Sequence, residues 1–249
     1  MTRFVLVLSL AISGCSGART PPAEECPQPE PRQPEAPEAR EPHESQEAQG
    51  HESHGHGHGH DPFEDAEACA KRFDSPERDE WQRPDVVIRA LKLESGSRVA
   101  EIGSATGYFA VRVARQVTEG RVWGVDIEPD MVRYLNDRAR REGLDNLFSI
   151  LGTADDPLLP EPVDVVLIVN TYHHIEHRTE YLRRLKTRLR EGGRVVVVDY
   201  KMGDFGSGPP ESMRLLPEVV QREFTEAGYQ LQHQDTDSLP RQYILVFGS

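Results

Sequence analysis

The sequence predicts an α/β fold: a Rossmann-like doubly wound sheet, mostly parallel, with an antiparallel C-terminal strand pair and helices on both faces. Two observations predict it. Between residues 97 and 199, short runs rich in valine and isoleucine alternate with segments of helical spacing, the pattern of parallel strands joined by crossover helices. The run Val99 to Ile102 also leads into a turn with two glycines, which is typical of a strand-to-helix connection that lies against a ligand.

Apolar periodicity and turn residues define the first elements. A helix is expected over 84–93, because apolar residues recur at 87, 88 and 91. Pro129 and Gly143 mark the start and end of another helix, since proline favours the first turn and glycine follows the last residue. The first half of the sheet is expected as strands over 97–102, 121–126 and 147–151, with helices over 107–118 and 129–142.

The second half of the domain repeats the alternation and then departs from it. We expect strands over 163–169 and 194–199 around a helix over 176–190, then a helix over 217–227 and strands over 229–235 and 242–247. The link between the last two strands is too short for a helical crossover, so they should pair in antiparallel fashion. Residues 61–249 thus form one domain, long enough to bury a core.

The glycine-rich turn carries the clearest chemical signal. It reads Glu101-x-Gly103-Ser104-Ala105-x-Gly107, which lacks the glycine spacing of a dinucleotide-binding turn. Glu101 would repel a pyrophosphate and attract a cation. The segment resembles the first motif of class I S-adenosylmethionine (SAM)-dependent methyltransferases, (Asp/Glu)-x-Gly-x-Gly-x-Gly, with alanine at the middle glycine. The resemblance implies that Glu101 lies near the cationic methionine end of SAM and that the turn residues pack under it.

Two downstream segments extend the same resemblance. Asp126 ends the second strand about twenty residues after the turn, where α/β folds place a carboxylate for ribose hydroxyls. The family places an apolar residue after this acid, here Ile127, against the adenine. The stretch after Gly152 resembles the adenine-side loop, in which Asp155 or Asp156 would accept from the adenine amino group.

Candidate catalytic residues follow the strand over 163–169. Asn170, Tyr172, His173 and His174 lie beyond its carboxyl end, where ligands bind in such sheets, so they are expected to face the cofactor's methyl group. His173 or His174 can serve as the base that methyl transfer to a protonated oxygen or nitrogen needs, and Tyr172 can line the pocket. Alternatively, one histidine packs against the following helix and the other is solvated.

Residues elsewhere in the domain point to the acceptor side of the same site. Arg83, Tyr200 and Lys201 precede or follow strands that end at this edge. The glycine- and proline-rich loop from Gly203 to Pro210 can act as a lid that decides substrate choice. The acceptor is expected to be a small molecule.

The N-terminus predicts export of a bacterial lipoprotein. Residues 1–15 contain one basic residue, an apolar run and the lipobox-like ending Ile12-Ser13-Gly14-Cys15. Cys15 would carry the lipid and anchor the protein to the membrane at the cell envelope. SAM is made in the cytoplasm, so this location requires a supply of cofactor across the membrane.

Residues 16–60 predict a disordered tether. Eight prolines and eight glutamates between 16 and 50, with almost no large apolar side chain, cannot drive folding. The tether ends in a histidine-rich tract that offers imidazoles to zinc or nickel, or is a solvated spacer without a ligand. The tract consists of His51, His54, His56, His58 and His60. The remaining cysteines, Cys26 and Cys69, permit one disulfide in an oxidising compartment, although Cys69 is expected to pack as a small apolar residue.

Charge excludes one class of partner. The whole chain carries a formal net charge of −13, and no basic patch argues for nucleic acid.

The leading hypothesis from the sequence is a lipoprotein-anchored methyltransferase for a small-molecule acceptor. The alternative is a catalytically inactive methyltransferase-like binding module that works with the histidine tract, and an NAD-dependent oxidoreductase ranks third because its glycine spacing is missing. No oligomeric state follows from the sequence.

Overall fold

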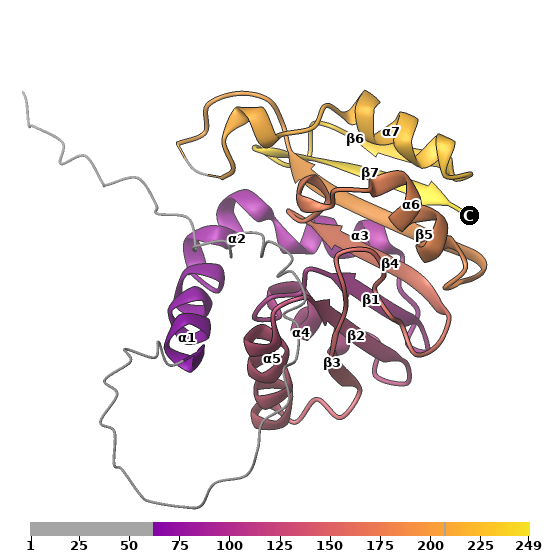
Figure 1. Ribbon diagram of the computed structural model, residues 1–249. Coiled ribbons are helices and arrows are strands. Elements are labelled where there is room, and N and C mark those ends of the chain that lie inside the picture. The colour runs from indigo at the N-terminus through magenta and orange to yellow at the C-terminus, as the bar shows by residue number, and fades with distance from the viewer. Residues whose placement is uncertain (1–61, 207) are drawn as a thin grey trace, which may run out of the picture.

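The computed structural model describes residues 62–206 and 208–249, with side chains from Ala66 onward. Its strands form one seven-stranded sheet in the order β3-β2-β1-β4-β5-β7-β6 (Figure 1). The strands are β1 (Arg98–Ile102), β2 (Arg121–Asp126), β3 (Leu147–Leu151), β4 (Val163–Val169), β5 (Leu189–Tyr200), β6 (Gln230–Asp235) and β7 (Gln242–Gly248). The helices are α1 (Pro62–Phe73), α2 (Pro76–Gln82), α3 (Pro84–Leu91), α4 (Tyr108–Ala114), α5 (Pro129–Glu142), α6 (Arg178–Lys186) and α7 (Pro217–Glu226), with short 3₁₀ turns η1 (Tyr172–His174) and η2 (Glu211–Met213).

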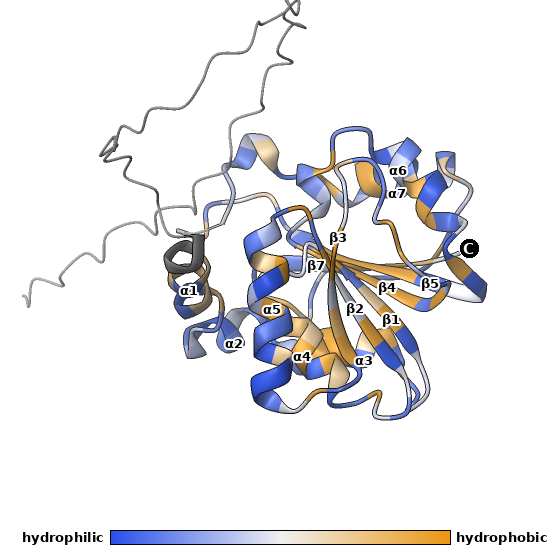
Figure 2. Ribbon diagram, turned by 60° about the horizontal axis from the view of Figure 1, so that its bottom comes forward, coloured by the Kyte–Doolittle hydropathy of each residue, from blue (hydrophilic) through white to orange (hydrophobic). Residues whose placement is uncertain are grey.

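Helices cover both faces of the sheet, as the alternating pattern predicts. Buried side chains of α3, α4 and α5 pack on one face, and those of α6 and α7 pack on the other. The central strands read as almost continuous apolar runs because both of their faces are buried. Figure 2 shows these apolar strands between helices whose outer surfaces are hydrophilic. The doubly wound fold is therefore confirmed.

Strand pairing sets the position of the functional edge. Strands β3, β2, β1, β4 and β5 are parallel, and β7 pairs antiparallel with both β5 and β6. The chain runs outward from β1 to β2 and β3, then returns to the other side of β1 as β4. Ligands of doubly wound sheets bind at such a switch point, beyond the carboxyl ends of the strands. Residues after β1 and β4 therefore face each other at this edge.

The largest boundary error of the sequence analysis concerns α6 and β5. The helix ends at Lys186, and β5 begins at Leu189 instead of Arg194. Leu189 pairs with Val163 and Arg194 with Val165, so the strand contains an irregularity; the sequence analysis assigns 189–190 to the helix and leaves 191–193 outside the strand. Gly192 lies within it at a φ of +74°, a conformation that glycine adopts without strain.

Several predictions for the N-terminal region lie outside the described residues. These are the signal and lipobox over 1–15, the tether over 16–60 and the histidine tract within it. Among the described residues, no helix is long and apolar enough to span a membrane. Cys69 is buried, as expected, and it is also disulfide-bonded, which the sequence permits but does not favour.

Candidate active site at the carboxyl edge of the sheet

Backbone hydrogen bonds bring four connecting segments together at this edge. The amides of Gly103 and Ser104 donate to the Val125 carbonyl at 2.8 and 3.0 Å, which sets the glycine-rich turn beside the end of β2. The Gly152 amide donates to the Asp126 carbonyl at 2.9 Å. On the other side, the Asn170 amide donates to the Val198 carbonyl at 2.9 Å. The segments that the sequence analysis singled out separately are thus neighbours.

The turn after β1 has the conformation that its glycines predict. Gly103 and Gly107 have φ values of +71° and +91°. A Cβ on Gly103 would lie 2.2 Å from the Thr171 Oγ1 atom, so glycine is required for the turn to contact the segment after β4. Ala105, in the position of the motif's middle glycine, also has a positive φ of +44°. Its methyl group is therefore held in a strained left-handed conformation.

Glu101 is a buried carboxyl group with one oxygen that no hydrogen bond from the described residues satisfies. Its side chain is buried, and its Oε2 atom has no hydrogen-bond partner among the described residues. Burial raises the pKa of this carboxyl to about 8, although the nearby charge of Arg78 acts to lower it. A buried acid with an unpaired oxygen is suited to a cationic ligand, such as the amino group of SAM.

Further unpaired polar atoms surround the same turn. The hydroxyls of Ser104 and Thr106 and the Oδ1 atom of Asp74 are buried without hydrogen-bond partners in the described part of the chain. Native proteins satisfy nearly all buried polar groups, so such a cluster indicates that a ligand or water completes it. The donors and acceptors present fit a polar cofactor of the kind that the resemblance implies.

Asp126 has a double role. Its Oδ2 atom accepts from the Ala105 amide at 2.8 Å and its Oδ1 atom from the Glu128 amide at 3.0 Å, so it ties the turn to the end of β2. Burial raises its pKa, while these two amides act to lower it. Each oxygen retains a lone pair that can accept from a hydroxyl. Ile127, the next residue, exposes 54% of its surface and leaves an apolar face available beside the carboxylate.

Asp155 and Asp156, in the loop after β3, have different roles. Asp156 accepts from the Leu158 amide at 2.8 Å through Oδ1, which shapes the loop. The Asp155 side chain is exposed, and its carbonyl accepts from the Arg184 guanidinium. Asp155 is thus the better placed of the two candidates for an external donor.

His173 of η1, the turn after β4, and Asp199 of the neighbouring strand β5 form a buried pair. The His173 Nδ1 atom lies 2.8 and 3.0 Å from the two carboxylate oxygens of Asp199, and each side chain is only 1% exposed. A carboxylate can only accept, so Nδ1 carries a proton, and in the neutral form of the ring the lone pair is on Nε2. No hydrogen bond to Nε2 occurs within the described residues. His174 is exposed, and its ring centroid lies 4.2 Å from that of His173.

Tyr172 does not line the site. Its ring is fully buried against Phe224 of α7, and its hydroxyl donates to Glu223 at 2.8 Å. Burial raises its pKa far above the usual value of a tyrosine. The 3₁₀ turn η1 points Tyr172 into the core under α7 and His173 toward Asp199, so the adjacent candidates separate. The geometry assigns Tyr172 to packing.

Helix α2 contributes residues that the sequence analysis missed. Gln82 donates to Gln242 at the start of β7, Gln242 donates to Asn170, and Asn170 donates back to Gln82 at 3.5 Å. Gln82 and Gln242 are fully buried. This ring of amides fixes α2 over the carboxyl edge, and the sequence analysis predicts no helix at those residues. The helix predicted over 84–93 is α3, whose apolar residues pack into the core.

Arg78 of α2 is the second omission. Its guanidinium lies over the Tyr108 ring, 3.8 Å from the centroid, and donates to the Phe73 carbonyl at 3.0 Å. Burial lowers its pKa, while the negative charge of Glu101 acts to raise it. A buried guanidinium beside Glu101 is suited to the carboxylate of the same methionine group. The short polar sequence of α2 carries no motif that would identify it.

The structure holds no candidate metal centre among its described residues: no group of three or more His, Cys, Asp or Glu side chains is placed to hold an ion. The proposed ligands His51, His54, His56, His58 and His60 all lie outside those residues. A surface hollow lined by Ile88, Lys92 and Gln116 lies between α3 and the end of α4, away from the site.

Comparison with known proteins identifies relatives of one kind. Residues 93–245 match the family model for a methyltransferase domain. The chain is 33% identical over 119 residues to 27-O-demethylrifamycin SV methyltransferase of Amycolatopsis mediterranei, covering 47% of this chain and 43% of that protein. It is 28% identical over 120 residues to demethylmenaquinone methyltransferase of Tropheryma whipplei, covering 48% of each protein. The match thus spans less than half the length of either relative.

Solved structures show the same fold. A SAM-dependent methyltransferase from Aquifex aeolicus matches 76% of this chain and 98% of its own, with a TM-score of 0.68 and 21% identity. The [4+2]-cyclase SpnF matches 68% of this chain and 80% of its own, with a TM-score of 0.59 and 18% identity. These matches show a shared fold, whereas such low identity carries no information on the acceptor.

Proposed function

Because the chain belongs to the family of SAM-dependent methyltransferases, we propose that it transfers a methyl group from SAM to a small-molecule acceptor. Bound SAM supplies a methyl carbon on a positively charged sulfur: the acceptor's lone pair forms the new bond to carbon as the carbon–sulfur bond breaks and its electrons remain on sulfur. The chain's own task is to bind and align the two reactants and to remove a proton from the acceptor.

The residues around the glycine-rich turn hold the cofactor in this proposal. Glu101 pairs with the amino group and Arg78 with the carboxylate of the methionine end. Asp126 accepts from the ribose hydroxyls, Ile127 lies against the adenine and Asp155 accepts from its amino group. Gly103, Ser104, Ala105 and Gly107 form the backbone under the methionine, and Asn170 borders it from β4. The unpaired oxygen of Glu101 and the unpaired hydroxyls beside it support this arrangement.

His173 is the proposed base. Asp199 holds the proton on Nδ1, so Nε2 is available to accept the proton of an acceptor hydroxyl or amine, and the resulting imidazolium is stabilised by the carboxylate. The segment 171–173 adjoins the cofactor turn, because Thr171 closes against Gly103. This buried His–Asp pair is the observation that carries catalysis over the alternative of an inactive binding module. His174 is the second candidate base, exposed beside the first.

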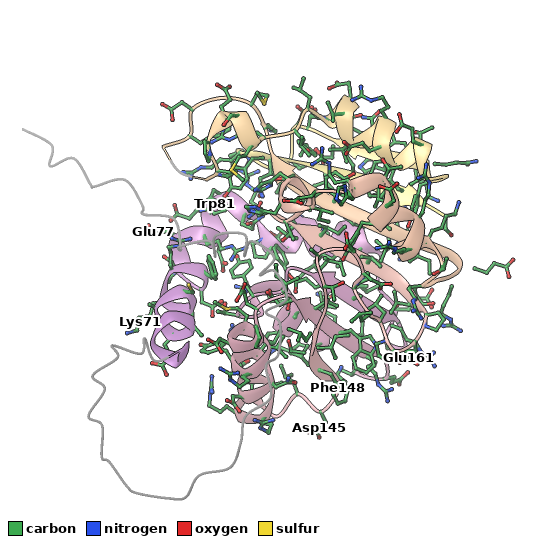
Figure 3. All side chains as sticks on the ribbon, in the orientation of Figure 1. Lys71, Glu77, Trp81, Asp145, Phe148 and Glu161 are labelled. Carbon is green, nitrogen blue, oxygen red and sulfur yellow. The ribbon has the colours of Figure 1, made fainter. Side chains whose placement is uncertain are left out.

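Asp199→Asn tests the pair. The expected result is a loss of about 10²- to 10⁴-fold in kcat, the usual contribution of a general base, with unchanged affinity for S-adenosylhomocysteine (SAH). SAH formation is measured over a panel of phenols, carboxylic acids, amines and thiols. Asp145→Asn is the matched control, because Asp145 is exposed far from this edge (Figure 3). Equal rates for the two variants would remove His173 and Asp199 from catalysis.

The tautomer gives a second readout that needs no acceptor. Long-range ¹⁵N NMR on the wild-type chain is expected to show a protonated Nδ1 and an unprotonated Nε2 for His173, with the signal assigned by its loss in His173→Asn. A chain that binds SAM, forms the expected tautomer and methylates nothing in the panel would favour the inactive binding module.

We further propose that the domain over 61–249 is tethered to the cell envelope as a bacterial lipoprotein through Cys15. The lipobox-like sequence supports this location, and so does the disulfide at Cys69, because disulfides persist in oxidising compartments. With Cys15 lipidated, Cys26 is the partner that the sequence leaves for Cys69. The histidine tract is proposed to bind zinc or nickel apart from catalysis, supported by its five imidazoles alone.

A further inference from the structure

One arginine of α5 holds the junction between α1 and α2 against the glycine-rich turn. The Arg138 Nη1 atom donates to the Asp74 Oδ2 atom at 2.6 Å and to the Thr106 carbonyl at 3.0 Å. The Arg138 side chain is only 15% exposed. Helix α1 also lies beside α5, as Figures 1 and 2 show. Because one nitrogen contacts both oxygens, the Asp74 carboxylate lies next to the backbone of the turn.

Asp74 keeps one carboxylate oxygen unused at this position. Its Oδ1 atom is buried and has no hydrogen-bond partner among the described residues, and the same is true of the Thr106 hydroxyl. Burial raises the pKa of Asp74, while the charges of Arg138, Arg78 and Arg112 act to lower it. A buried acceptor without a donor costs free energy, so a donor from a ligand or from water is favoured at this oxygen.

The neighbouring cations leave this oxygen unpaired. Arg112 pairs with Asp79 at 3.0 Å, and Arg138 divides its donors between Asp74 and Glu142. These guanidiniums are engaged elsewhere, and neither bonds to the Asp74 Oδ1 atom. The oxygen is therefore available to a cation that comes from outside the chain.

Arg78 is a common neighbour of Asp74 and Glu101. Its guanidinium donates to the carbonyl of Phe73, the residue before Asp74, at 3.0 Å. It also lies over the Tyr108 ring, at the start of the helix that follows the glycine-rich turn. The charge of Arg78 acts to lower the pKa of both acids, which places it near each of them. Both acids thus lie around one guanidinium, and each has an oxygen without a donor in the described part of the chain.

The charges of this cluster match the methionine end of SAM. That end carries one ammonium group and one carboxylate, and Arg78 is already proposed to pair with the carboxylate. An ammonium group has three N–H donors, more than the one free oxygen of Glu101 accepts from. The free oxygen of Asp74 supplies a second charged acceptor, and each such bond is stronger than one between neutral groups.

We propose that Asp74 binds the amino group of SAM together with Glu101, and that Arg138 is the positioning residue that holds Asp74 at the glycine-rich turn. This inference rests on the proposed function and adds a residue to its cofactor site. Asp74 precedes residues 93–245, which match the methyltransferase domain model, and it belongs to none of the motifs of the sequence analysis. The N-terminal segment then supplies a charge that selects the amino group of the cofactor.

The binding test uses the full chain and three ligands that differ at the methionine end. SAH carries both charged groups, deamino-SAH lacks only the amino group, and decarboxy-SAH lacks only the carboxylate. In titration calorimetry, Asp74→Asn is expected to weaken SAH and decarboxy-SAH about tenfold and to leave deamino-SAH unchanged, since one charge-assisted contact corresponds to about a tenfold change. Arg78→Gln is expected to show the converse selectivity, with decarboxy-SAH spared. Asp85→Asn is the matched control, because Asp85 pairs with Arg89 on the exposed surface of α3.

Arg138 is tested by the same comparison. Arg138→Gln leaves both acids in place but frees Asp74, so it should lower the affinity for decarboxy-SAH relative to deamino-SAH, and Arg138→Lys should recover part of that ratio. A purely structural role in holding α1 would change the affinity for all three ligands alike and leave the ratio unmoved. Arg138→Gln also decides the inference when Asp74→Asn does not fold, as judged by thermal unfolding.

The outcomes separate this inference from the proposed function. If the wild-type chain binds none of the three ligands, the proposed function fails and the inference fails with it. If the wild type binds SAH but Asp74→Asn weakens all three ligands equally, or none of them, the inference alone is overturned. A loss confined to the two ligands that carry the amino group supports it.

Discussion

Glu101→Gln should make the free protein more stable and the cofactor complex weaker. Burial raises the pKa of Glu101 to about 8 in the folded chain, from 4.5 in the absence of the fold. Between these two pH values the folded state holds a proton that the unfolded state has lost. Stability is therefore fully present below pH 4.5, falls as the pH rises, and becomes level above about pH 8. Glutamine keeps the shape of the protonated side chain and does not titrate.

The size of the effect follows from the distance between the two pKa values. Each pH unit above 4.5 costs the wild type about 1.4 kcal/mol of folding free energy, until the folded carboxyl itself ionises. Relative to the wild type, Glu101→Gln should therefore gain about 1 kcal/mol at pH 5 and about 3 kcal/mol at pH 7. Loss of the carboxylate should weaken SAH binding at pH 8 by about 1.5–3 kcal/mol, the value of a charge-assisted hydrogen bond.

Urea unfolding at pH 5 and pH 7 measures the first effect, and titration calorimetry with SAH measures the second. Glu191→Gln is the control, because Glu191 is exposed and the same chemical change there should alter neither quantity. Binding of a cation by wild-type Glu101 below pH 8 also releases a proton, so SAH affinity should rise with pH up to about 8. A stability gain that does not grow between pH 5 and pH 7 would refute the assignment of Glu101 as a buried carboxyl group with a raised pKa.

Three further predictions concern the turn, the ribose contact and the anchor. Ala105→Gly should stabilise the chain by about 1 kcal/mol, because it removes a methyl group held at φ +44°, and thermal unfolding will show whether that strain exists. Asp126→Ala should weaken SAH binding by about 1.5–3 kcal/mol and also destabilise the free chain, since it leaves the Ala105 and Glu128 amides unpaired; calorimetry that finds full affinity would remove Asp126 from the site. Cys15→Ser should abolish fatty-acid labelling and membrane partitioning, whereas unlabelled wild type in the cytoplasm would contradict the lipoprotein proposal.

The sheet was predictable because each strand carries its own signal. Valine-rich runs that are buried on both faces can be recognised as strands from their own residues, without knowledge of the strands that flank them. Their parallel arrangement follows from the helices between them. The antiparallel end was predictable from the short link alone, and the structure confirms it. The boundary of α6 was not, because the segment before Gly192 has helical residues but pairs with β4.

The catalytic pair shows where prediction from sequence stops. A histidine after β4 was a candidate because of its place in the fold, but the choice between His173 and His174 depends on which ring reaches Asp199. That contact joins residues 26 positions apart and is fixed by the register that pairs Val169 with Val198. The expectation that Tyr172 lines the pocket did not hold for a related reason. A 3₁₀ turn places the adjacent side chains of Tyr172 and His173 in different environments, and no repeating sequence pattern predicts such a turn.

Helix α2 was missed because its position is determined by polar contacts over long sequence distances. Its seven residues include five that are charged or amide-bearing, so they give no amphipathic stripe. It is held by the bond from Gln82 to Gln242, 160 residues away, and it presents Arg78 toward Glu101 while Gln82 meets Asn170 just after β4. One short helix therefore contacts both the proposed cofactor side and the segment that leads to the proposed base. Because buried amides lose more when unpaired than they gain when paired, the ring with Asn170 fixes α2 in register, and the two halves of the site are aligned by the same contact.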